Sequence, residues 1–181
     1  HAVSRLATEI GRSFGRVDIL WNGAFGWIEG PLEAADVGAL AEFLDASVRG
    51  PIMLTKALMP LLLEAGDAHV MNIVADWEFP AIDGLSAFIA AKRALAGFGV
   101  ALQREKHGVL RVTNVHPADV ASKGYDDRED ARSLIDRTEN HLIPLSEICA
   151  TMIFIFKLQG TLVHQIDLKP LNQEIGISFI S

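Results

Sequence analysis

Short apolar segments rich in β-branched residues alternate with helical patterns along the chain, and this alternation is the feature that most limits its possible folds. The segments that we interpret as strands are VDILWN (17–22), HVMNIVA (69–75), LRVTNVHP (110–117) and TLVHQIDLKP (161–170). Strands separated by helices pair in parallel, because each crossover returns the chain to the same end of the sheet. Since these segments are apolar on both faces, we expect helices on both sides of one parallel sheet.

Apolar residues at helical spacing predict helices between these strands. The expected helices cover residues 2–14, 37–64, 85–106 and 145–158, with a weaker pattern over 128–138. Gly15 and Gly66 follow two of them as stop signals. The pair Gly50–Pro51 predicts an irregularity in the long second helix. Ser146 and Glu147 are residue types that favour the start of a helix, here of the last one.

Composition excludes several classes of function. The chain has 181 residues, half of them apolar, and a formal net charge of −7 without a basic cluster, which argues against nucleic acid as a partner. Cys149 is the only cysteine, so neither an internal disulfide nor a cysteine metal cage can form. We expect a small buried side chain there and a reducing, cytoplasmic location. The six histidines lack HxxxH and HxH spacing, so no metal site is predicted.

The sequence predicts neither a membrane span nor a signal peptide. The densest apolar run, ALMPLLL, is short and contains Pro60. The first fifteen residues have the pattern of an amphipathic helix, and no initiator Met precedes them. We therefore expect that residues are missing upstream.

Four segments together resemble the short-chain dehydrogenase/reductase family in their order and spacing: FGRVDILWNGAF, HVMNIVADWEF, LSAFIAAKRALAGFGVALQRE and LRVTNVHPADVAS. This resemblance implies an α/β fold with a Rossmann-like, doubly wound parallel sheet. Family members have seven strands. Residues 1–181 resemble a single domain that covers the C-terminal two-thirds of that fold, without its first three strands.

The resemblance implies NAD(P)(H) as cofactor. Five positions correspond to residues that bind it: Asn22, Ala24, Lys92, Pro117 and Val120. The Gly-rich loop, where a pyrophosphate meets a helix N-terminus, would lie in the part without a counterpart here, and no other segment has its pattern. Phe25 replaces a glycine of the family's Asn-Asn-Ala-Gly loop, and with Trp21 it is expected to add bulk on the adenine-ribose side. These departures argue against ordinary cofactor binding.

The resemblance also assigns four catalytic positions, three of them substituted. Lys92 matches the Lys that lowers the pKa of a Tyr four residues earlier, but that Tyr position holds Phe88. Ala75 stands at the position of a substrate-orienting Ser, and Ser47 at that of a proton-relaying Asn. Phe and Ala side chains exchange no proton, and general acid–base catalysis contributes roughly 10²–10⁴-fold in rate. We therefore expect little of the family reaction to remain.

A few other side chains near the expected cleft carry acid–base groups. Asp76 and Glu78 follow Ala75, His116 ends the third strand, and Tyr125 lies in the loop above. An active enzyme would need His116, Tyr125 or a water as its proton donor. No Gly-x-Ser-x-Gly elbow supports a hydrolase.

The helices over 37–65 and 85–106 are apolar on more than one face, and such helices need cover from a core or a partner. The resemblance places both at a subunit interface, so we expect a homo-oligomer, or a hetero-oligomer with a related subunit. The leading hypothesis is a catalytically impaired family member that acts as an oligomeric or scaffold subunit. The alternatives are an active NAD(P)(H)-dependent oxidoreductase acting on a small alcohol or carbonyl compound, and a small-molecule binder without turnover.

Overall fold

A four-stranded parallel sheet forms the centre of the computed structural model, which describes residues 2–76, 83–121 and 141–172. Its strand order is β1-β2-β3-β6. The strands are β1 (Ile19–Asn22), β2 (His69–Ile73), β3 (Arg111–Pro117) and β6 (Gln165–Leu168). The predicted α/β parallel sheet is thus confirmed, with four strands where the resemblance implies seven for the complete family fold.

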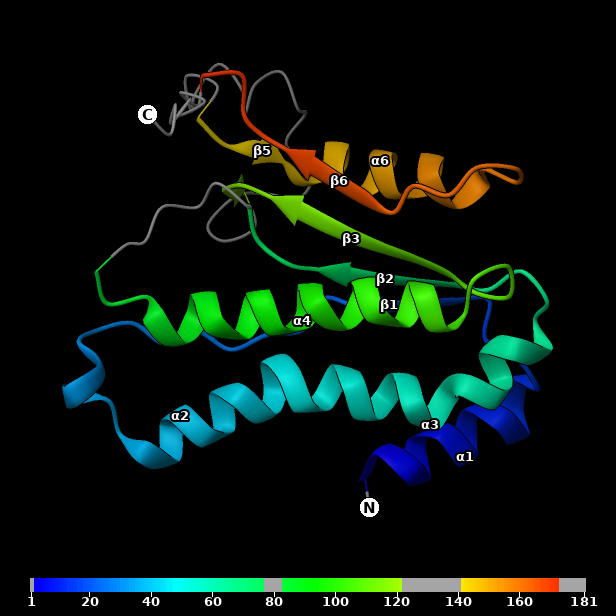
Figure 1. The fold of residues 1–181 in the computed structure, drawn as a ribbon, viewed down its shortest axis with the longest axis horizontal. Coiled ribbons are helices and arrows are strands. Elements are labelled where there is room, and N and C mark those ends of the chain that lie inside the picture. Colours follow the sequence, from blue (N-terminus) through cyan, green and yellow to red (C-terminus); the bar gives the residue numbers. More distant parts are fainter. Residues whose placement is uncertain (1, 77–82, 122–140, 173–181) are drawn as a thin grey trace.

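Helices cover both faces of this sheet (Figure 1). The helices on one face are α1 (Ala2–Phe14), α2 (Val37–Leu44), α3 (Gly50–Glu64) and α4 (Ser86–Glu105), and α6 (Leu145–Lys157) lies on the other. The remaining elements are η1 (Leu32–Ala34), η2 (Asp45–Arg49) and the parallel pair β4 (Val120–Ala121) and β5 (Ile143–Pro144). The weaker helical prediction over 128–138 lies outside the described residues.

The helix predicted over 37–64 is continuous, and its irregularity lies one turn earlier than expected. The segment η2 is a π-helical turn in which the Gly50 N–H donates to the Asp45 carbonyl. Pro51 follows, and a proline ring clashes with the carbonyl four residues before it, so the wider turn relieves that clash. Gly66 ends the helix with a φ of 75°, as predicted.

Pro60 lies inside this helix and does not end it, in agreement with the helix predicted over 37–64. Pro60 is exposed, so the carbonyl that loses its intrahelical bond can reach water. Val37–Glu64 is accordingly the one helix among the described residues that is long and apolar enough, by length and composition alone, to cross a membrane. Here its Leu58 and Leu62 pack into the core, and 28% of its apolar window is buried.

Two expectations for α6 are wrong. Cys149 is exposed, because the buried positions of this helix recur at Ile148, Met152 and Ile155 and leave the intervening residue on the solvent side. The helix begins after Pro144 without a side-chain cap, so Ser146 and Glu147 lie within its first turn.

Buried asparagines join the strands across the sheet interior. Asn22, Asn72 and Asn114 occupy one register row of β1, β2 and β3. The Asn22 amide donates to Asn72 Oδ1 (2.9 Å), and the Asn72 amide donates to Asn114 Oδ1 (3.0 Å). Thr55 of α3 accepts from Asn22, and the Ala96 carbonyl of α4 accepts from Asn114. We call these three side chains the asparagine ladder; it ties two helices to three strands.

Helix α4 approaches the ladder closely because residue 99 has no side chain. A Cβ on Gly99 would come within 2.1 Å of Asn114 Oδ1 and 2.7 Å of Asn72 Nδ2. Glycine is therefore required where the helix crosses the ladder. This contact sets the position of α4 on the sheet, and hence the position of Phe88 and Lys92 relative to the strand ends.

Candidate active site

A cavity of about 820 Å³ lies at the carboxyl ends of β1, β2 and β3, where parallel α/β sheets bind their ligands. Its walls come from the segments that follow these strands, from α4 and from the start of α6. The predicted site residues that line it are Ala24, Ala75, Phe88, Lys92, Pro117 and Val120.

Lys92 lies inside this site with its side chain almost fully buried. Only 6% of its surface is exposed. Its Nζ donates to the Ile73 carbonyl oxygen at 3.2 Å and lies 3.6 Å from the centroid of the Phe25 ring. Burial lowers the pKa of Lys92 from 10.5 to about 8, because the cation loses its hydration.

Aromatic rings surround the lysine where the resemblance implies a tyrosine hydroxyl. The Phe88 ring centroid lies 5.6 Å from Lys92 Nζ, and the ring packs edge-on against Phe25 and at a tilt against Trp27. Phe25 and Trp27 belong to the loop after β1. Phe25 therefore lies against the lysine, which corrects the expectation that it adds bulk on the adenine-ribose side. The sequence signal for this contact was the presence of two aromatic residues, Phe25 and Trp27, in the Gly-rich loop.

Ser47 holds that loop in place. Its hydroxyl oxygen accepts the Gly26 N–H at 3.2 Å, and the side chain is buried in η2 and absent from the cavity wall. Ser47 therefore lies behind the aromatic loop and does not line the cavity.

The two candidates for a replacement acid that lie in described segments, His116 and Asp76, do not line the large cavity. His116 Nδ1 donates to the Ala75 carbonyl at 2.8 Å, and burial is the main cause that lowers the pKa of its imidazole. His116 borders instead a narrow pocket behind Ala75, together with Asp76. Asp76 is buried and forms an ion pair with Lys169 (3.5 Å). The other two candidates, Glu78 and Tyr125, lie outside the described residues.

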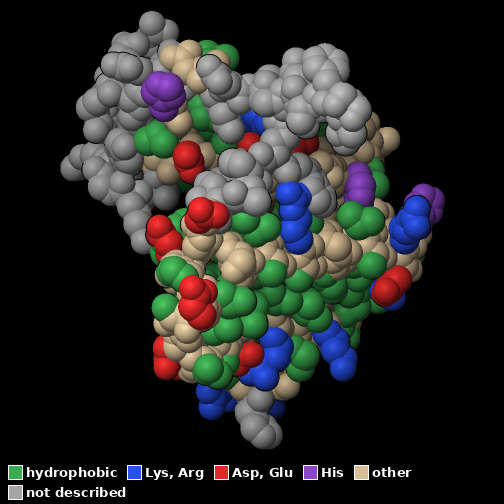
Figure 2. Space-filling view, turned by 60° about the vertical axis from the view of Figure 1, so that its left-hand side comes forward, with side chains coloured by type: hydrophobic (Ala, Val, Ile, Leu, Met, Phe, Trp, Pro, Cys, Tyr) green, Lys and Arg blue, Asp and Glu red, His purple; other side chains and the backbone are tan. Residues whose placement is uncertain are grey.

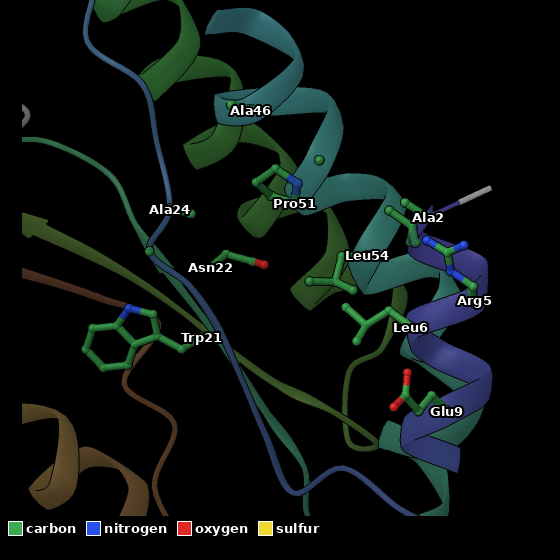
Figure 3. Close-up of a pocket in the computed structure, with 13 residues that line it drawn as sticks. Ala2, Arg5, Leu6, Glu9, Trp21, Asn22, Ala24, Ala46, Pro51 and Leu54 are labelled. Atoms are coloured by element: carbon green, nitrogen blue, oxygen red, sulfur yellow. The ribbon is translucent and has the colours of Figure 1, made fainter. Parts of the chain in front are cut away.

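Asn22, a predicted cofactor residue, is committed to the sheet interior. Its amide nitrogen donates to Asn72 Oδ1 and Thr55 Oγ1, so both N–H groups serve the asparagine ladder. Figure 3 shows Asn22 pointing toward α3 and Trp21 pointing to the opposite side of β1, as alternate residues of a strand do.

A second cavity, of about 520 Å³, lies between α1, α3 and β1 (Figure 3). Leu6 of α1, Leu54 of α3 and Ala24 line it, with Arg5 and Glu9 beside them. It follows the edge of β1, which pairs only with β2 among the described residues. No motif in the sequence predicted this cavity. Within the described residues, no three His, Cys, Asp or Glu side chains are placed to hold a metal ion.

Known proteins resemble this chain in both sequence and fold. The model of the short chain dehydrogenase family matches residues 1–133. SadH of Mycobacterium tuberculosis is 32% identical over 123 residues, which are 66% of this chain and 44% of SadH. Short chain dehydrogenase mpl6 of Monascus purpureus is 30% identical over 156 residues, 84% of this chain and 51% of mpl6. The chain thus spans about half the length of these relatives.

Solved structures show the same fold at lower identity. An alcohol dehydrogenase from Thermococcus sibiricus, complexed with 5-hydroxy-NADP, superposes with a TM-score of 0.80 at 18% identity, covering 95% of this chain and 71% of that one. The sequence match and the shared parallel sheet agree on one assignment: this chain belongs to the short-chain dehydrogenase family.

Proposed function

We propose that this protein has lost the proton transfer of its family and acts as a non-catalytic subunit of an oligomer, formed with its own copies or with a related family member. The observation that carries the proposal is the surroundings of Lys92. Two phenylalanine rings and a backbone carbonyl contact its amine, and Phe88 stands where the resemblance implies a tyrosine.

The cavity wall lacks the groups that reduction of a carbonyl needs. Among the described residues that line it, only Lys92 and Asp119 are ionisable, and none carries a hydroxyl group. Phe88 and Ala75 cannot donate a proton to a substrate oxygen or hold that oxygen in place. The alternative, an active oxidoreductase for small alcohols or carbonyl compounds, requires a proton donor in place of the tyrosine, for which the described part of the wall offers only Lys92 and Asp119.

The residues around Lys92 also do not fit a nicotinamide ribose. A family lysine binds the ribose hydroxyls, whereas the Phe25 ring covers this amine at 3.6 Å. Several solved relatives are complexed with NADP or NADPH. For this chain we propose that the ring takes the place of that contact, and we derive no step through the cofactor.

Exposed apolar side chains on the helical layer support an oligomer. Leu44, Met53 and Leu63 of α2 and α3 are each at least 38% exposed. Helix α4 presents Ala90, Ala94, Gly97 and Ala101 to solvent, and small residues permit close approach of a second helix. Figure 2 shows hydrophobic side chains gathered over the middle of one face of the molecule. A surface of this kind is typical of a subunit interface.

Turnover assays test the loss of chemistry. With NADH or NADPH and a panel of aldehydes, ketones and hydroxy acids, we expect the full protein to oxidise the cofactor no faster than its Lys92→Ala variant. Robust oxidation that Lys92→Ala abolishes would show that the protein is an active oxidoreductase.

Sedimentation velocity tests the oligomer. We expect a dimer or tetramer that Ala94→Glu dissociates, because the new carboxylate would be buried without a partner at the interface. Val109→Glu, at an exposed turn beyond α4, is the matched control and should leave the assembly intact. A monomeric protein at micromolar concentration, alone and with related subunits, would contradict the scaffold role.

The large cavity supports a second candidate function, the binding of a small molecule without turnover. Four aromatic side chains, Trp21, Phe25, Trp27 and Phe88, line it together with Ile148. Calorimetric titration with apolar aromatic compounds would detect such binding, and the absence of heat with every compound would argue against it.

A further inference from the structure

Lys92 carries the only amine on the wall of the large cavity within the described part of the chain. An amine is a nucleophile only when it has lost its proton. Whether this amine can react therefore depends on what stabilises its charged form, since Lys92 lines the cavity although the Phe25 ring centroid lies 3.6 Å from its Nζ.

In the described part of the chain, neutral groups contact the cation of Lys92. Its Nζ meets one carbonyl oxygen at 3.2 Å and two ring faces, and no described carboxylate forms an ion pair with it. Asp119 borders the same cavity, and Asp76, Arg93 and His116 border the narrow pocket that also touches Lys92. Burial remains the cause that lowers its pKa to about 8. At pH 7 roughly a tenth of Lys92 is then neutral, against roughly one part in 3,000 for an ordinary lysine.

We propose that Lys92 captures an apolar aldehyde in this cavity by forming an imine. The neutral Nζ attacks the carbonyl carbon, a C–N bond forms, and a proton passes from nitrogen to oxygen to give a carbinolamine. The C–O bond then breaks, water leaves, and a C=N bond remains. The step consumes no cofactor and transfers no hydride, so it goes beyond the proposed subunit role and is independent of it.

The cavity favours an apolar aldehyde for two physical reasons. Trp27, Phe25 and Phe88 offer ring surfaces on which an aromatic or aliphatic group can pack. In addition, the product is an uncharged imine at neutral pH, so capture removes a cation from a site that hydrates it poorly. Burial that disfavours the ammonium therefore favours the adduct.

Reductive trapping on the full protein tests the proposal. Benzaldehyde with cyanoborohydride at pH 7 converts each imine into a stable benzyl amine, which peptide mass mapping locates. We expect labelling of Lys92 at least about tenfold faster than labelling of Lys56 or Lys157, which are exposed lysines of the same chain. Labelling of Lys92 no faster than that of Lys56 would overturn the proposal.

Two variants assign the adduct. Lys92→Arg keeps the positive charge, lacks the primary amine and should remove the fast phase of labelling. Lys56→Arg is the matched control and should retain it. A fast phase that survives in Lys92→Arg would overturn the assignment.

The pH and the aldehyde provide further tests. The ratio of Lys92 to Lys56 labelling should fall toward unity as pH rises from 7 to above 10, because both amines are then neutral. Glyoxylate, a small charged aldehyde, should show less preference for Lys92 than benzaldehyde does. A ratio independent of pH, or an equal preference with glyoxylate, would contradict capture of an apolar aldehyde by a neutral buried amine. Turnover and sedimentation are measured separately, so failure here is distinguishable from failure of the subunit role.

Discussion

The asparagine ladder and the Lys92 cleft are both buried polar regions of one sheet, yet they differ in how their polar groups are satisfied. In the ladder, Asn22, Asn72 and Asn114 bond one another and both flanking helices at 2.8–3.2 Å. In the cleft, the Lys92 amine has one carbonyl oxygen at 3.2 Å, and otherwise faces rings.

This difference separates residues that hold the fold from residues that line the cavity. The ladder would lose stability with any change, because each amide supports its neighbour. The cleft has Phe88 and Ala75 where the resemblance implies hydroxyl-bearing side chains, and burial disfavours the cation of its lysine. Replacing a polar residue by an apolar one should therefore have opposite effects in the two regions.

Breaking the ladder at its centre should give the largest effect. Asn72→Leu keeps the branched shape of the side chain but leaves Asn114 Oδ1 without its donor and removes one of the two acceptors of the Asn22 amide. Asn114 Oδ1 and one N–H of Asn22 then lack partners, each at a cost of roughly 1–3 kcal/mol, so we expect a loss of about 4 kcal/mol. Urea unfolding measures it. A loss below about 1 kcal/mol would show that the ladder does not hold the sheet.

The contact between α4 and the ladder should be the next most sensitive. Gly99→Ala places a Cβ against the Asn114 amide, so the helix must shift or a ladder bond must break, at about 3 kcal/mol. Gly97→Ala in the same helix meets nothing within 4 Å and should stabilise by about 0.5–1 kcal/mol. Equal effects of the two substitutions would contradict this role of Gly99.

His69, on β2, should make stability depend on pH. Its Nε2 bonds Thr113 Oγ1 at 2.7 Å, its Nδ1 is buried without a hydrogen-bond partner in the described structure, and burial lowers its pKa from 6.5 to about 4. The unfolded chain binds this proton first, so the contribution is present above pH 6.5 and is lost as pH falls toward 4. About 2 kcal/mol should disappear between pH 7 and pH 5.

Denaturant unfolding of the wild type and of His69→Leu over this pH range checks this dependence. The variant should lack that part of the pH slope, while the part due to His116, whose pKa is also lowered, remains. Identical slopes in both proteins would assign the pH dependence to other groups.

The cleft should respond in the opposite direction and with the smallest change. Lys92→Met removes a buried cation and keeps an apolar chain of similar length, so we expect a gain of about 1 kcal/mol at pH 7. The gain should vanish above pH 10.5, where the lysine is neutral in both the folded and the unfolded chain. Thermal unfolding at pH 7 and at about pH 11 measures both values. A destabilised variant at pH 7 would place Lys92 among the residues that hold the fold.

Much of the fold followed from the sequence because periodicity reports burial directly. The spacing of apolar residues located α1, α4 and α6 to within two residues, and collinear motifs located Phe88 and Lys92 on one helical face. The asparagine ladder was not predicted. A single asparagine in an apolar strand does not indicate a hydrogen-bond partner, because the partner depends on the strand register. The contact of Phe25 with Lys92 was not predicted either, because it depends on the conformation of the loop after β1. The hydrogen bond from Gly26 to Ser47 sets that conformation, and hydrophobic periodicity does not report it.

The ionisation of Lys92 tests the account most directly. NMR of the full protein with ¹³C-labelled lysine, assigned with Lys92→Arg, follows its Cε resonance as pH rises, first alone and then with millimolar NADPH. We predict a midpoint near the pKa of about 8, the same with and without the cofactor, because Phe25 covers the amine. A midpoint near the ordinary value of 10.5, or a resonance that moves when NADPH is added, would contradict it.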